Sequence, residues 1–287
     1  MLEYFLMAAR EENITKAAGL LHVTQPTLSR QLMQLEEELG VKLFERTGHS
    51  VTLTEEGILF RSRAQDIVAL AEKAKNEIVQ NEDTLTGTVS VGCVELKSVQ
   101  ELSAWIVSFQ RQYPKVKFEL YSGSNEDIQE RMEQGSLELG LFLLPFNLSR
   151  YATISMRIRE RWGVLIHRES PLAANRVIRP GELVGTPVVT IHVNTPAHKE
   201  LIRWSGEYAK LMDFSMNYNV LHNAVIAARE QKGVAICLEP DCHYDEMKFI
   251  PFKPEIQVGS ALAWKEERRH SKAVREFISY VQGQYKG

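Results

Sequence analysis

The chain has 287 residues, of which 44% are hydrophobic and 25% are charged, and its formal net charge at pH 7 is −3. This length and composition predict a folded protein of two or three domains and exclude a disordered chain. No apolar run approaches the roughly 20 residues of a membrane-spanning helix, and the first residues lack the basic-then-apolar order of a signal peptide. We therefore expect a cytoplasmic protein with no membrane partner.

The segment 15–35 predicts two short amphipathic helices that are joined by a tight turn. In the second helix, leucines recur at steps of three and four, which is the spacing of one buried face: Leu28, Leu32, Leu35 and Leu39. We expect Thr15 and Thr24 to cap the starts of the two helices. Gly40 is expected to end the second helix. This arrangement is a helix-turn-helix.

The opposite face of the second helix carries polar side chains, namely Thr27, Arg30, Gln31 and Gln34. Such side chains suit the major groove of DNA, because arginine can fork onto guanine, glutamine can bind adenine, and a hydroxyl can bind phosphate. Polar residues on a helix more often form only a solvated face. For this stripe taken alone, both interpretations stay open.

Several short motifs surround the two helices. They are Leu2-Glu3-Tyr4-Phe5, Thr15-Lys16-Ala17-Ala18, Leu21-His22-Val23-Thr24-Gln25-Pro26-Thr27-Leu28-Ser29, Leu35-Glu36, Leu39-Gly40-Val41-Lys42-Leu43-Phe44-Glu45-Arg46 and Leu53-Thr54-Glu55-Glu56-Gly57. Together they resemble the winged helix-turn-helix of LysR-type transcriptional regulators. The resemblance implies double-stranded DNA as a partner, and it places Gln25, Pro26, Ser29 and Arg30 on the DNA.

By the same resemblance, Arg46 lies at the base of the wing, a hairpin beside the second helix. Where the family commonly has a wing arginine, this chain has His49, whose neutral imidazole attracts a phosphate-lined groove less. The predicted DNA-binding residues are Gln25, Pro26, Thr27, Ser29, Arg30, Gln31, Gln34, Arg46 and His49. Because residues 1–61 contain more acidic than basic side chains, phosphate binding must depend on local placement, helix N-termini and doubling of the module.

After the wing, Glu55 and Glu56 predict the first turn of a long helix that runs to about Asn81. Apolar residues along it alternate steps of four and three, as in a coiled-coil seam: Phe60, Ala64, Ile67, Ala71, Ala74 and Ile78. Little neighbouring chain is available to cover this seam, so we predict that it pairs two subunits. In the similar regulators it is the linker helix, which implies a homodimer, and a dimer of dimers or homotetramer, on a pseudo-palindromic operator.

From Thr88 onward, strands alternate with helices, which predicts mostly parallel, helix-covered sheets in two lobes. Motifs in this half are similar to the effector-binding domain of the same regulators, which is similar to periplasmic binding proteins; among them are Gly87-Thr88-Val89-Ser90-Val91-Gly92, Gly135-Ser136-Leu137-Glu138-Leu139-Gly140 and Gly233-Val234-Ala235-Ile236-Cys237-Leu238-Glu239-Pro240. We therefore expect an α+β chain. Its parts are a winged helix-turn-helix at 1–58, a linker helix at 59–84 and a two-lobed α/β effector-binding domain at 85–287, with lobe I at about 85–161 and 265–287 and lobe II at about 162–264.

In open α/β sheets, ligands bind beyond the carboxyl ends of strands, near helix N-termini. By the resemblance, such ends outline the pocket of a small-molecule effector, with Glu95, Lys97, Ser98, Ser122, Ser124, Thr195, His222 and Asn223 as its candidate residues. Ser98 and Thr195 have the alternative role of capping their helices. For Glu95, three alternatives stay open: it points to solvent, pairs with Lys97, or selects a cationic or hydrogen-donating effector.

The three cysteines, Cys93, Cys237 and Cys242, are too few for a disulfide framework and fit a reducing compartment. A redox pair of Cys237 and Cys242, or a zinc site that adds His243, fits less well, because Cys237 lies in an apolar run and no fourth ligand is evident. The histidines lack an adjacent nucleophile motif and no glycine-rich phosphate loop is present. We therefore predict no enzyme, no catalytic residue, no cofactor and no metal.

The leading prediction is a nucleoid-associated LysR-type regulator whose DNA binding is modulated by an effector, with RNA polymerase as a partner if it activates transcription. The alternative is a cytoplasmic small-molecule-binding module or redox sensor whose helix-turn-helix serves only for assembly.

Overall fold

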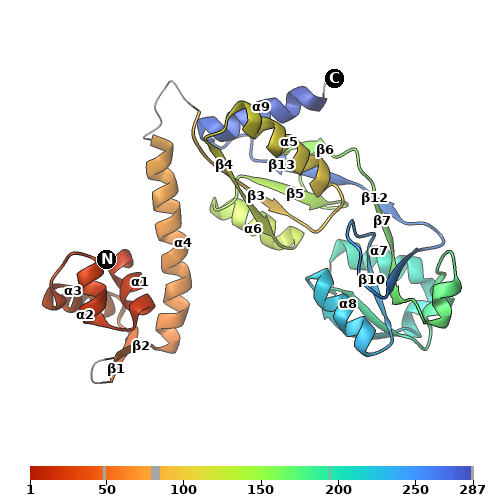
Figure 1. Cartoon of the computed structure of the whole chain (residues 1–287), viewed down its shortest axis with the longest axis horizontal. Coiled ribbons are helices and arrows are strands. Elements are labelled where there is room, and N and C mark those ends of the chain that lie inside the picture. Colours follow the sequence, from red (N-terminus) through yellow and green to blue (C-terminus); the bar gives the residue numbers. More distant parts are fainter. Residues whose placement is uncertain (48–49, 79–84, 194, 286–287) are drawn as a thin grey trace. The chain divides into compact units, whose positions relative to one another are not determined.

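A computed structural model describes residues 1–47, 50–78, 85–193 and 195–285, with the backbone alone at 46, 47, 50, 69 and 72–78. The chain divides into two compact units, Met1–Gln80 and Asn81–Gly287. The first unit is mainly helical and the second contains two sheets with flanking helices (Figure 1). This architecture confirms the predicted α+β class. In the described residues, no helix combines the length and the apolar character needed to cross a bilayer.

The first unit is a helical cluster with a two-stranded antiparallel hairpin. Its elements are α1 (Leu2–Glu11), α2 (Ile14–Leu20), α3 (Gln25–Leu39), β1 (Phe44–Thr47), β2 (Ser50–Leu53) and α4 (Glu55–Ile78). The apolar faces of the helices meet in one core, which includes Phe5, Ala17, Leu28 and Leu32. Leu39, which we expected in the buried row, is 43% exposed because it is the last residue of α3.

The helix ends differ in part from the predictions. Asn13, and not Thr15, caps α2, because its side-chain oxygen accepts a hydrogen bond from the amide of Lys16 at 2.9 Å. Thr24 precedes α3 as expected, but its hydroxyl hydrogen-bonds the hydroxyl of Thr27 at 2.8 Å instead of a backbone amide. Gly40 ends α3 in the left-handed conformation, with φ 71°, as predicted.

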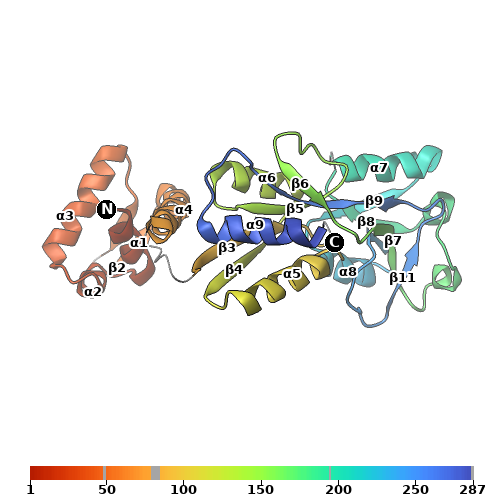
Figure 2. The ribbon, with the colours of Figure 1, turned by 90° about the horizontal axis from the view of Figure 1, so that it is seen from above.

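The first sheet of the second unit, with its helices, is called lobe I. Its strand order is β4-β3-β5-β13-β6, with β3 (Gly87–Cys93), β4 (Val116–Ser122), β5 (Leu139–Leu143), β6 (Ala152–Ser155) and β13 (Ser260–Trp264). Helices α5 (Val99–Gln112) and α9 (Lys272–Tyr285) lie side by side on one face (Figures 1 and 2), where the rings of Phe109 and Phe277 are 5.2 Å apart. Helix α6 (Asn125–Gln134) covers the other face, where Ile128 packs against Gly92 and Gly140.

The second sheet, with its helices, is called lobe II. Its strand order is β11-β7-β10-β8-β9, and β12 also pairs with β7. The strands are β7 (Glu160–His167), β8 (Pro187–Ile191), β9 (Asp213–Tyr218), β10 (Val234–Leu238), β11 (Met247–Pro251) and β12 (Gln257–Val258). Helices α7 (Pro196–Ser205) and α8 (Leu221–Glu230) lie on opposite sides of the sheet (Figure 2). Short 3-10 turns are η1 (Pro171–Ala174), η2 (Pro180–Leu183) and η3 (Gly206–Lys210).

Two features of the lobes correct the prediction. β13, expected in lobe II, pairs with β5 and β6 of lobe I, because its buried residues pack between these two strands. Each sheet also combines parallel and antiparallel pairs, whereas the alternation of strands and helices predicted mostly parallel ones. Strands that return from the neighbouring lobe enter antiparallel, and local periodicity does not contain this information.

Candidate nucleic-acid interface and interlobe contact

The polar face of α3 lies on the surface of the first unit. Gln25, Pro26, Thr27, Arg30 and Gln34 are exposed, and Ser29 and Gln31 are half-buried. Two hydrogen bonds order this face: Gln25 Nε2 donates to Ser29 Oγ at 3.1 Å, and Gln34 Nε2 donates to Glu38 Oε1 at 3.0 Å. Within the described part of the chain, Arg30 forms no ion pair. Its guanidinium is therefore available to a phosphate or a base edge.

The predicted wing is present as the antiparallel hairpin of β1 and β2. Arg46 lies in β1, opposite Val51, but its side chain is not among those described. His49 lies outside the described residues. The backbone thus confirms a hairpin directly after α3, while the role of both side chains stays a prediction.

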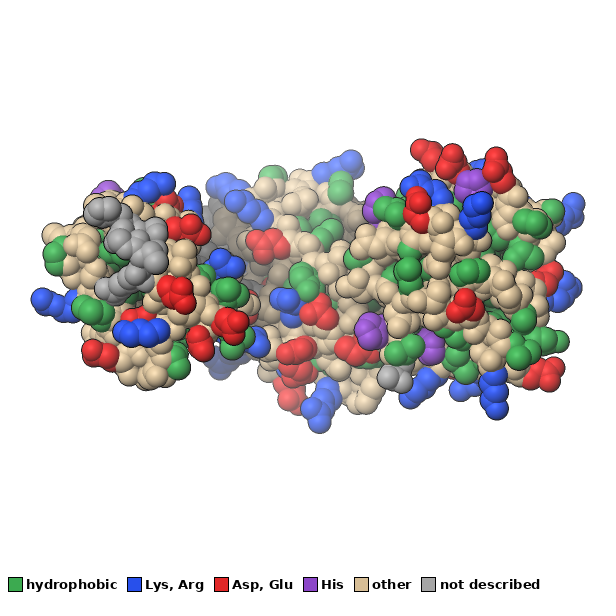
Figure 3. Space-filling view, turned by 90° about the horizontal axis from the view of Figure 1, so that it is seen from below, with side chains coloured by type: hydrophobic (Ala, Val, Ile, Leu, Met, Phe, Trp, Pro, Cys, Tyr) green, Lys and Arg blue, Asp and Glu red, His purple; other side chains and the backbone are tan. Residues whose placement is uncertain are grey.

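Acidic side chains of the first unit are in part turned inward. The Glu11 carboxylate, with 8% of its side chain exposed, pairs with Lys16 at 2.7 Å and with Arg10 at 3.2 Å. On the face drawn in Figure 3, basic and acidic side chains lie interspersed. The binding of a polyanion to this unit therefore depends on the placement of individual basic side chains rather than on a broad positive electrostatic potential.

Glu36 anchors the hairpin to α3. Its side chain is buried, and Oε1 accepts hydrogen bonds from the amides of Leu43 at 2.8 Å and Phe44 at 3.1 Å, while Oε2 lies 3.1 Å from Lys42 Nζ. Burial raises the pKa of Glu36, but the bonds from Leu43, Lys42 and Phe44 outweigh it and hold this pKa below its ordinary value of 4.5. Sequence reasoning missed this role, although a carboxylate four residues after Leu32, on the leucine face, was a signal.

The seam predicted along α4 is corrected at its first two residues. The ring of Phe60 lies 4.9 Å from that of Phe5 of α1, and Ala64 is fully buried in the core of the first unit. Helix α1 covers these residues, so neighbouring chain is available where we expected little of it. Further along, Ile67 is 52% exposed and Ala71 is also exposed. Ala74 and Ile78 lie in α4, but their side chains are not described.

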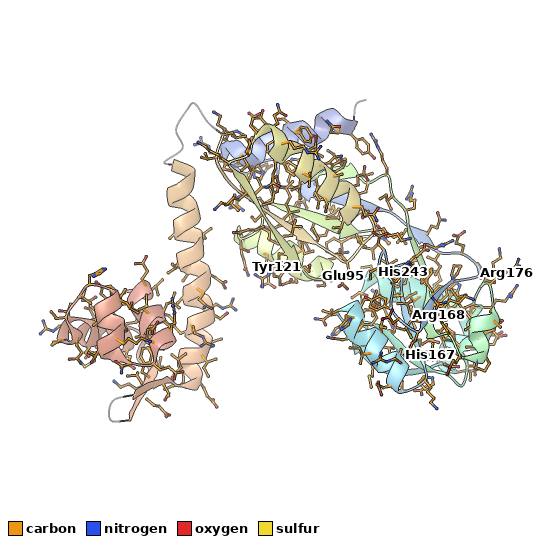
Figure 4. All side chains as sticks on the ribbon, in the orientation of Figure 1. Glu95, Tyr121, His167, Arg168, Arg176 and His243 are labelled. Atoms are coloured by element: carbon orange, nitrogen blue, oxygen red, sulfur yellow. The ribbon has the colours of Figure 1, made fainter. Side chains whose placement is uncertain are left out.

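In the second unit, a carboxylate of lobe I reaches a helix of lobe II. Glu95 Oε2 accepts a hydrogen bond from the amide of Leu221, the first residue of α8, at 3.0 Å. Figure 4 labels Glu95 at the end of lobe I and His243 in lobe II. The residue before α8 is Val220, whose side chain cannot accept a hydrogen bond, so Glu95 supplies the missing cap. Of the three alternatives for Glu95, pairing with Lys97 is not what the structure shows.

Two further contacts join the lobes beside Glu95. Lys97 Nζ lies 3.1 Å from the Glu239 carboxylate, which also binds Arg161. Gln100 donates a hydrogen bond from its side chain to Asp241. Burial raises the pKa of Glu239, but hydrogen bonds from Arg161 and Lys97 lower it more, so the net pKa lies below 4.5 and the carboxylate is ionised at neutral pH.

Ser98 does not cap α5 with its hydroxyl, which was the alternative role that we gave it. It is fully buried, and its hydroxyl accepts a hydrogen bond from Ser260 Oγ at 2.8 Å. Glu160 of β7 instead holds the two residues before the helix, because its carboxylate accepts from the amides of Lys97 at 3.1 Å and Ser98 at 3.0 Å. In the first turn of α5, the amides of Val99 and Gln100 donate to the carbonyls of Leu96 and Lys97, so the capping role given to the Ser98 hydroxyl is wrong.

The other predicted effector residues separate into two groups. Ser124 accepts from the amide of Asp127 at 3.2 Å and caps α6, and Thr195 accepts from the amide of His198 at 3.1 Å and caps α7. Exposed positions are occupied by Ser122, His222 and Asn223. The structure therefore brings Glu95 to the first turn of α8, which contains His222 and Asn223, while Ser124 and Thr195 serve separate helices.

Two tyrosines near Glu95 were not predicted. Tyr218 donates its hydroxyl hydrogen bond to the carbonyl of Ile236 at 2.9 Å, and burial, with Cys237 and Glu95 nearby, raises its pKa well above 10. The pKa of Tyr244 is also raised, first by burial and then by Cys242 and Glu95. Because these residues come from separate segments, no local motif could have revealed them.

The three cysteines differ in solvent exposure. Cys93 and Cys237 are buried and Cys242 is exposed. Burial raises the pKa of Cys93 to about 12 and raises that of Cys237 further above its ordinary value. Among the described residues, no group of three or more histidine, cysteine, aspartate or glutamate side chains is arranged to hold a metal ion.

Comparisons with known proteins match both units. The family model described as "Bacterial regulatory helix-turn-helix protein, lysR family" matches residues 1–58, and that described as "LysR substrate binding domain" matches residues 82–286. The chain is 29% identical to the "Uncharacterized HTH-type transcriptional regulator YybE" of Bacillus subtilis (strain 168), over 98% of this chain and 96% of that protein. It is 36% identical to the "HTH-type transcriptional regulator BsdA" of the same organism, over 48% of this chain and 47% of that protein.

Solved structures share the fold. Full-length CbnR complexed with its target DNA is 19% identical to this chain, with a TM-score of 0.72 over 98% of both chains. Full-length BenM is 21% identical, with a TM-score of 0.54 over 99% of this chain and 96% of BenM.

Proposed function

The chain belongs to the LysR family of transcriptional regulators, with a DNA-binding helix-turn-helix and an effector-binding substrate domain, and on this premise we propose how it binds DNA and senses a ligand. It binds a pseudo-palindromic operator in double-stranded DNA as a homodimer or a dimer of dimers. A small molecule at the interlobe contact modulates that binding. The protein acts as a regulator rather than an enzyme, in the cytoplasm at the nucleoid, and contacts RNA polymerase where it activates.

The observation that carries the DNA-binding proposal is the two-faced character of α3. Leu28, Leu32 and Leu35 are buried, whereas Arg30 is exposed and forms no ion pair within the described residues. A helix with this division presents its polar face to the major groove. We propose as DNA contacts Gln25, Pro26, Thr27, Ser29, Arg30, Gln31, Gln34, Arg46 and His49.

For assembly, we propose a division into a winged helix-turn-helix at 1–58, a linker helix at 59–84 and an effector-binding domain at 85–287. The exposed Ile67 and Ala71 of α4 support pairing of two subunits along this helix, and we propose that Ala74 and Ile78, three and seven positions after Ala71, extend the same interface. Doubling of the module places two recognition helices on two half-sites.

For the effector, we propose that Glu95, Lys97, Ser122, His222 and Asn223 face the ligand. Ser98, Ser124 and Thr195 support it indirectly, because their hydroxyls are engaged by Ser260 or by helix amides. Ligand binding that alters the Glu95 contact with α8 changes the relative free energy of open and closed lobes, which is the requirement for a ligand-dependent switch.

The test begins with selection of duplexes from a random library on the full-length protein. Affinity for a selected and a scrambled duplex is then measured by fluorescence anisotropy at several salt concentrations. We expect preference for the selected duplex and weaker binding as salt rises. Arg30→Ala should weaken binding by about 1–3 kcal/mol, or roughly 5- to 150-fold. Lys117→Ala, which removes an exposed cation of β4, is the matched control and should bind as the parent does. Equal binding of Arg30→Ala and the parent would overturn the proposal.

A further inference from the structure

The short segment from Lys42 to Phe44 connects three elements of the first unit. It follows Gly40 at the end of α3, its last residue is the first residue of β1, and it contacts Thr54, the residue before α4. The amide of Thr54 donates to the carbonyl of Leu43 at 3.1 Å, and Thr54 Oγ1 donates to the carbonyl of Lys42 at 2.7 Å. The same Thr54 hydroxyl accepts from the amide of Gly57 at 2.9 Å, in the first turn of α4. Lys42 and Leu43 are therefore bonded to the start of the long helix.

Glu36 bonds the same segment from the other side. Its carboxylate accepts from the amides of Leu43 and Phe44 and from Lys42 Nζ, and the residue is 4% exposed. Hydrogen bonds to a charged acceptor are stronger than neutral ones. The backbone of Leu43 is thus held by α3 through its N–H and by Thr54, the residue before α4, through its carbonyl.

Packing leaves this junction little room. A Cβ atom at Gly57 would lie 2.1 Å from the Leu43 carbonyl oxygen, so no side chain fits between α4 and the segment at this position. By contrast, Gly40 and Val41 are exposed. Gly40 has the left-handed φ of 71°, which glycine adopts readily because it has no Cβ atom. Because the connection itself is exposed, the orientation of the hairpin relative to α3 depends on the contacts of the hairpin. These are the Glu36 bonds, the burial of Leu43, Phe44 and Val51 in the core, and the bond from the Val51 amide to the Glu12 carbonyl at 3.0 Å.

We propose that Glu36 is a positioning residue for DNA binding: its carboxylate fixes the β1–β2 hairpin relative to α3 and, through Leu43 and Thr54, ties both to α4. Helix and hairpin then meet the DNA as one rigid body, with the major-groove and hairpin contacts in register. This inference rests on the proposed DNA-binding function. Glu36 itself is buried and does not touch the DNA.

The test uses the full-length protein and a duplex selected for it, with Glu36→Gln as the variant. Glutamine keeps the size and one acceptor oxygen but removes the charge and turns a donor amide toward Lys42. We expect binding to weaken about 10-fold, corresponding to one charge-assisted hydrogen bond. Hydroxyl-radical footprinting should show loss of protection at the nucleotides flanking the α3 contacts, while guanine N7 protection by α3 persists. Glu37→Gln, an exposed neighbour on the same helix, is the control and should leave both signals unchanged.

The outcomes separate positioning from a purely structural role. If folded Glu36→Gln binds as the parent does, or loses all protections in equal proportion, the proposal is wrong. If Glu36→Gln does not fold, Thr54→Val is tested in its place. This variant lacks the hydroxyl that donates to the Lys42 carbonyl. Selective loss of flanking protection in Thr54→Val, with rescue in Thr54→Ser, supports the rigid junction, and its absence overturns it. Failure of the parent protein to protect any duplex would instead contradict the proposed function.

Discussion

The carboxylate of Glu95 accepts a hydrogen bond at 3.0 Å from the amide of Leu221, 126 positions later in the chain. A residue of lobe I thereby caps α8 of lobe II. Val220, the residue before α8, has no side-chain acceptor for a hydrogen bond. The negative charge also meets the positive end of the helix dipole. Contact between the lobes and stability of the first turn of α8 are therefore coupled through one side chain.

This coupling predicts the behaviour of Glu95→Gln. Without the charge, the N-terminal amides of α8 should exchange with deuterium about 2- to 10-fold faster, because charge at a helix N-terminus contributes roughly 0.3–1 kcal/mol and more in partly buried geometry. Hydrogen-exchange mass spectrometry of peptides spanning the first turn measures this. The matched control, Glu119→Gln, changes an exposed glutamate of β4 and should have no effect. Equal exchange in both variants would contradict the coupling.

Self-association should depend on the exposed part of α4. Ile67 is 52% exposed on this helix, so Ile67→Glu leaves the core of the first unit intact but places a charge in the proposed subunit interface. We expect the dimer dissociation constant to rise about 10- to 100-fold, because burying an uncompensated polar group costs roughly 1–3 kcal/mol. Sedimentation velocity over a concentration series measures it. Ser62→Glu, also exposed on α4, is the control. Unchanged assembly of Ile67→Glu would exclude Ile67 from the interface.

Two glycines of the first unit should respond oppositely to alanine. Gly57→Ala places a methyl group 2.1 Å from the Leu43 carbonyl oxygen, whereas a Cβ at Gly19 of α2 meets nothing within 4 Å. We expect Gly57→Ala to lower the free energy of unfolding by about 1–3 kcal/mol through overpacking. Gly19→Ala should be neutral or stabilise α2 by roughly 0.5–1 kcal/mol. Urea unfolding followed by circular dichroism compares them, and similar effects of both would argue against the tight junction.

The pH dependence of the free energy of unfolding should show how much the ionised Glu36 carboxylate stabilises the fold. Because its pKa is held below 4.5 in the folded protein, the ionised carboxylate stabilises the fold above that pH, and this contribution is lost as the pH falls through the folded pKa. Glu36→Gln should therefore destabilise the protein at pH 7, by about 1–3 kcal/mol, and approach the parent at acidic pH. Urea unfolding at pH 7, 5 and 4 measures the difference. A difference that stays constant over this range would show that the charge does not contribute.

The thiols should react unequally. In the folded protein at pH 8, iodoacetamide should modify the exposed Cys242 before the buried Cys93 and Cys237, because only an accessible thiolate reacts. Mass spectrometry of timed digests gives the order, and the same reaction in urea is the control in which all three should react. Formation of a Cys237–Cys242 disulfide on exposure to peroxide would instead favour the redox-sensor alternative.

Local patterns were sufficient for the helix-turn-helix. The leucine spacing of α3 and the glycine at its end predicted a helix with one buried and one polar face, because side chains three and four residues apart share a face whatever the rest of the chain does. Leu28 and Leu32 are buried and Arg30 is exposed. The motifs around α3 also predicted the family. They could be recognised in the sequence because each of them is a short, contiguous run of residues.

Only the tertiary structure decided which residues join distant segments. Glu160 reaches Ser98 across 62 positions, and Phe60 is covered by Phe5 of α1. The spacing of apolar residues states that a face is buried but not what buries it, so Phe60 and Ala64 resembled a subunit seam. A buried carboxylate accepts hydrogen bonds from whichever unpaired amides the fold places beside it. Which amides these are depends on the packing of whole elements rather than on neighbours in the chain.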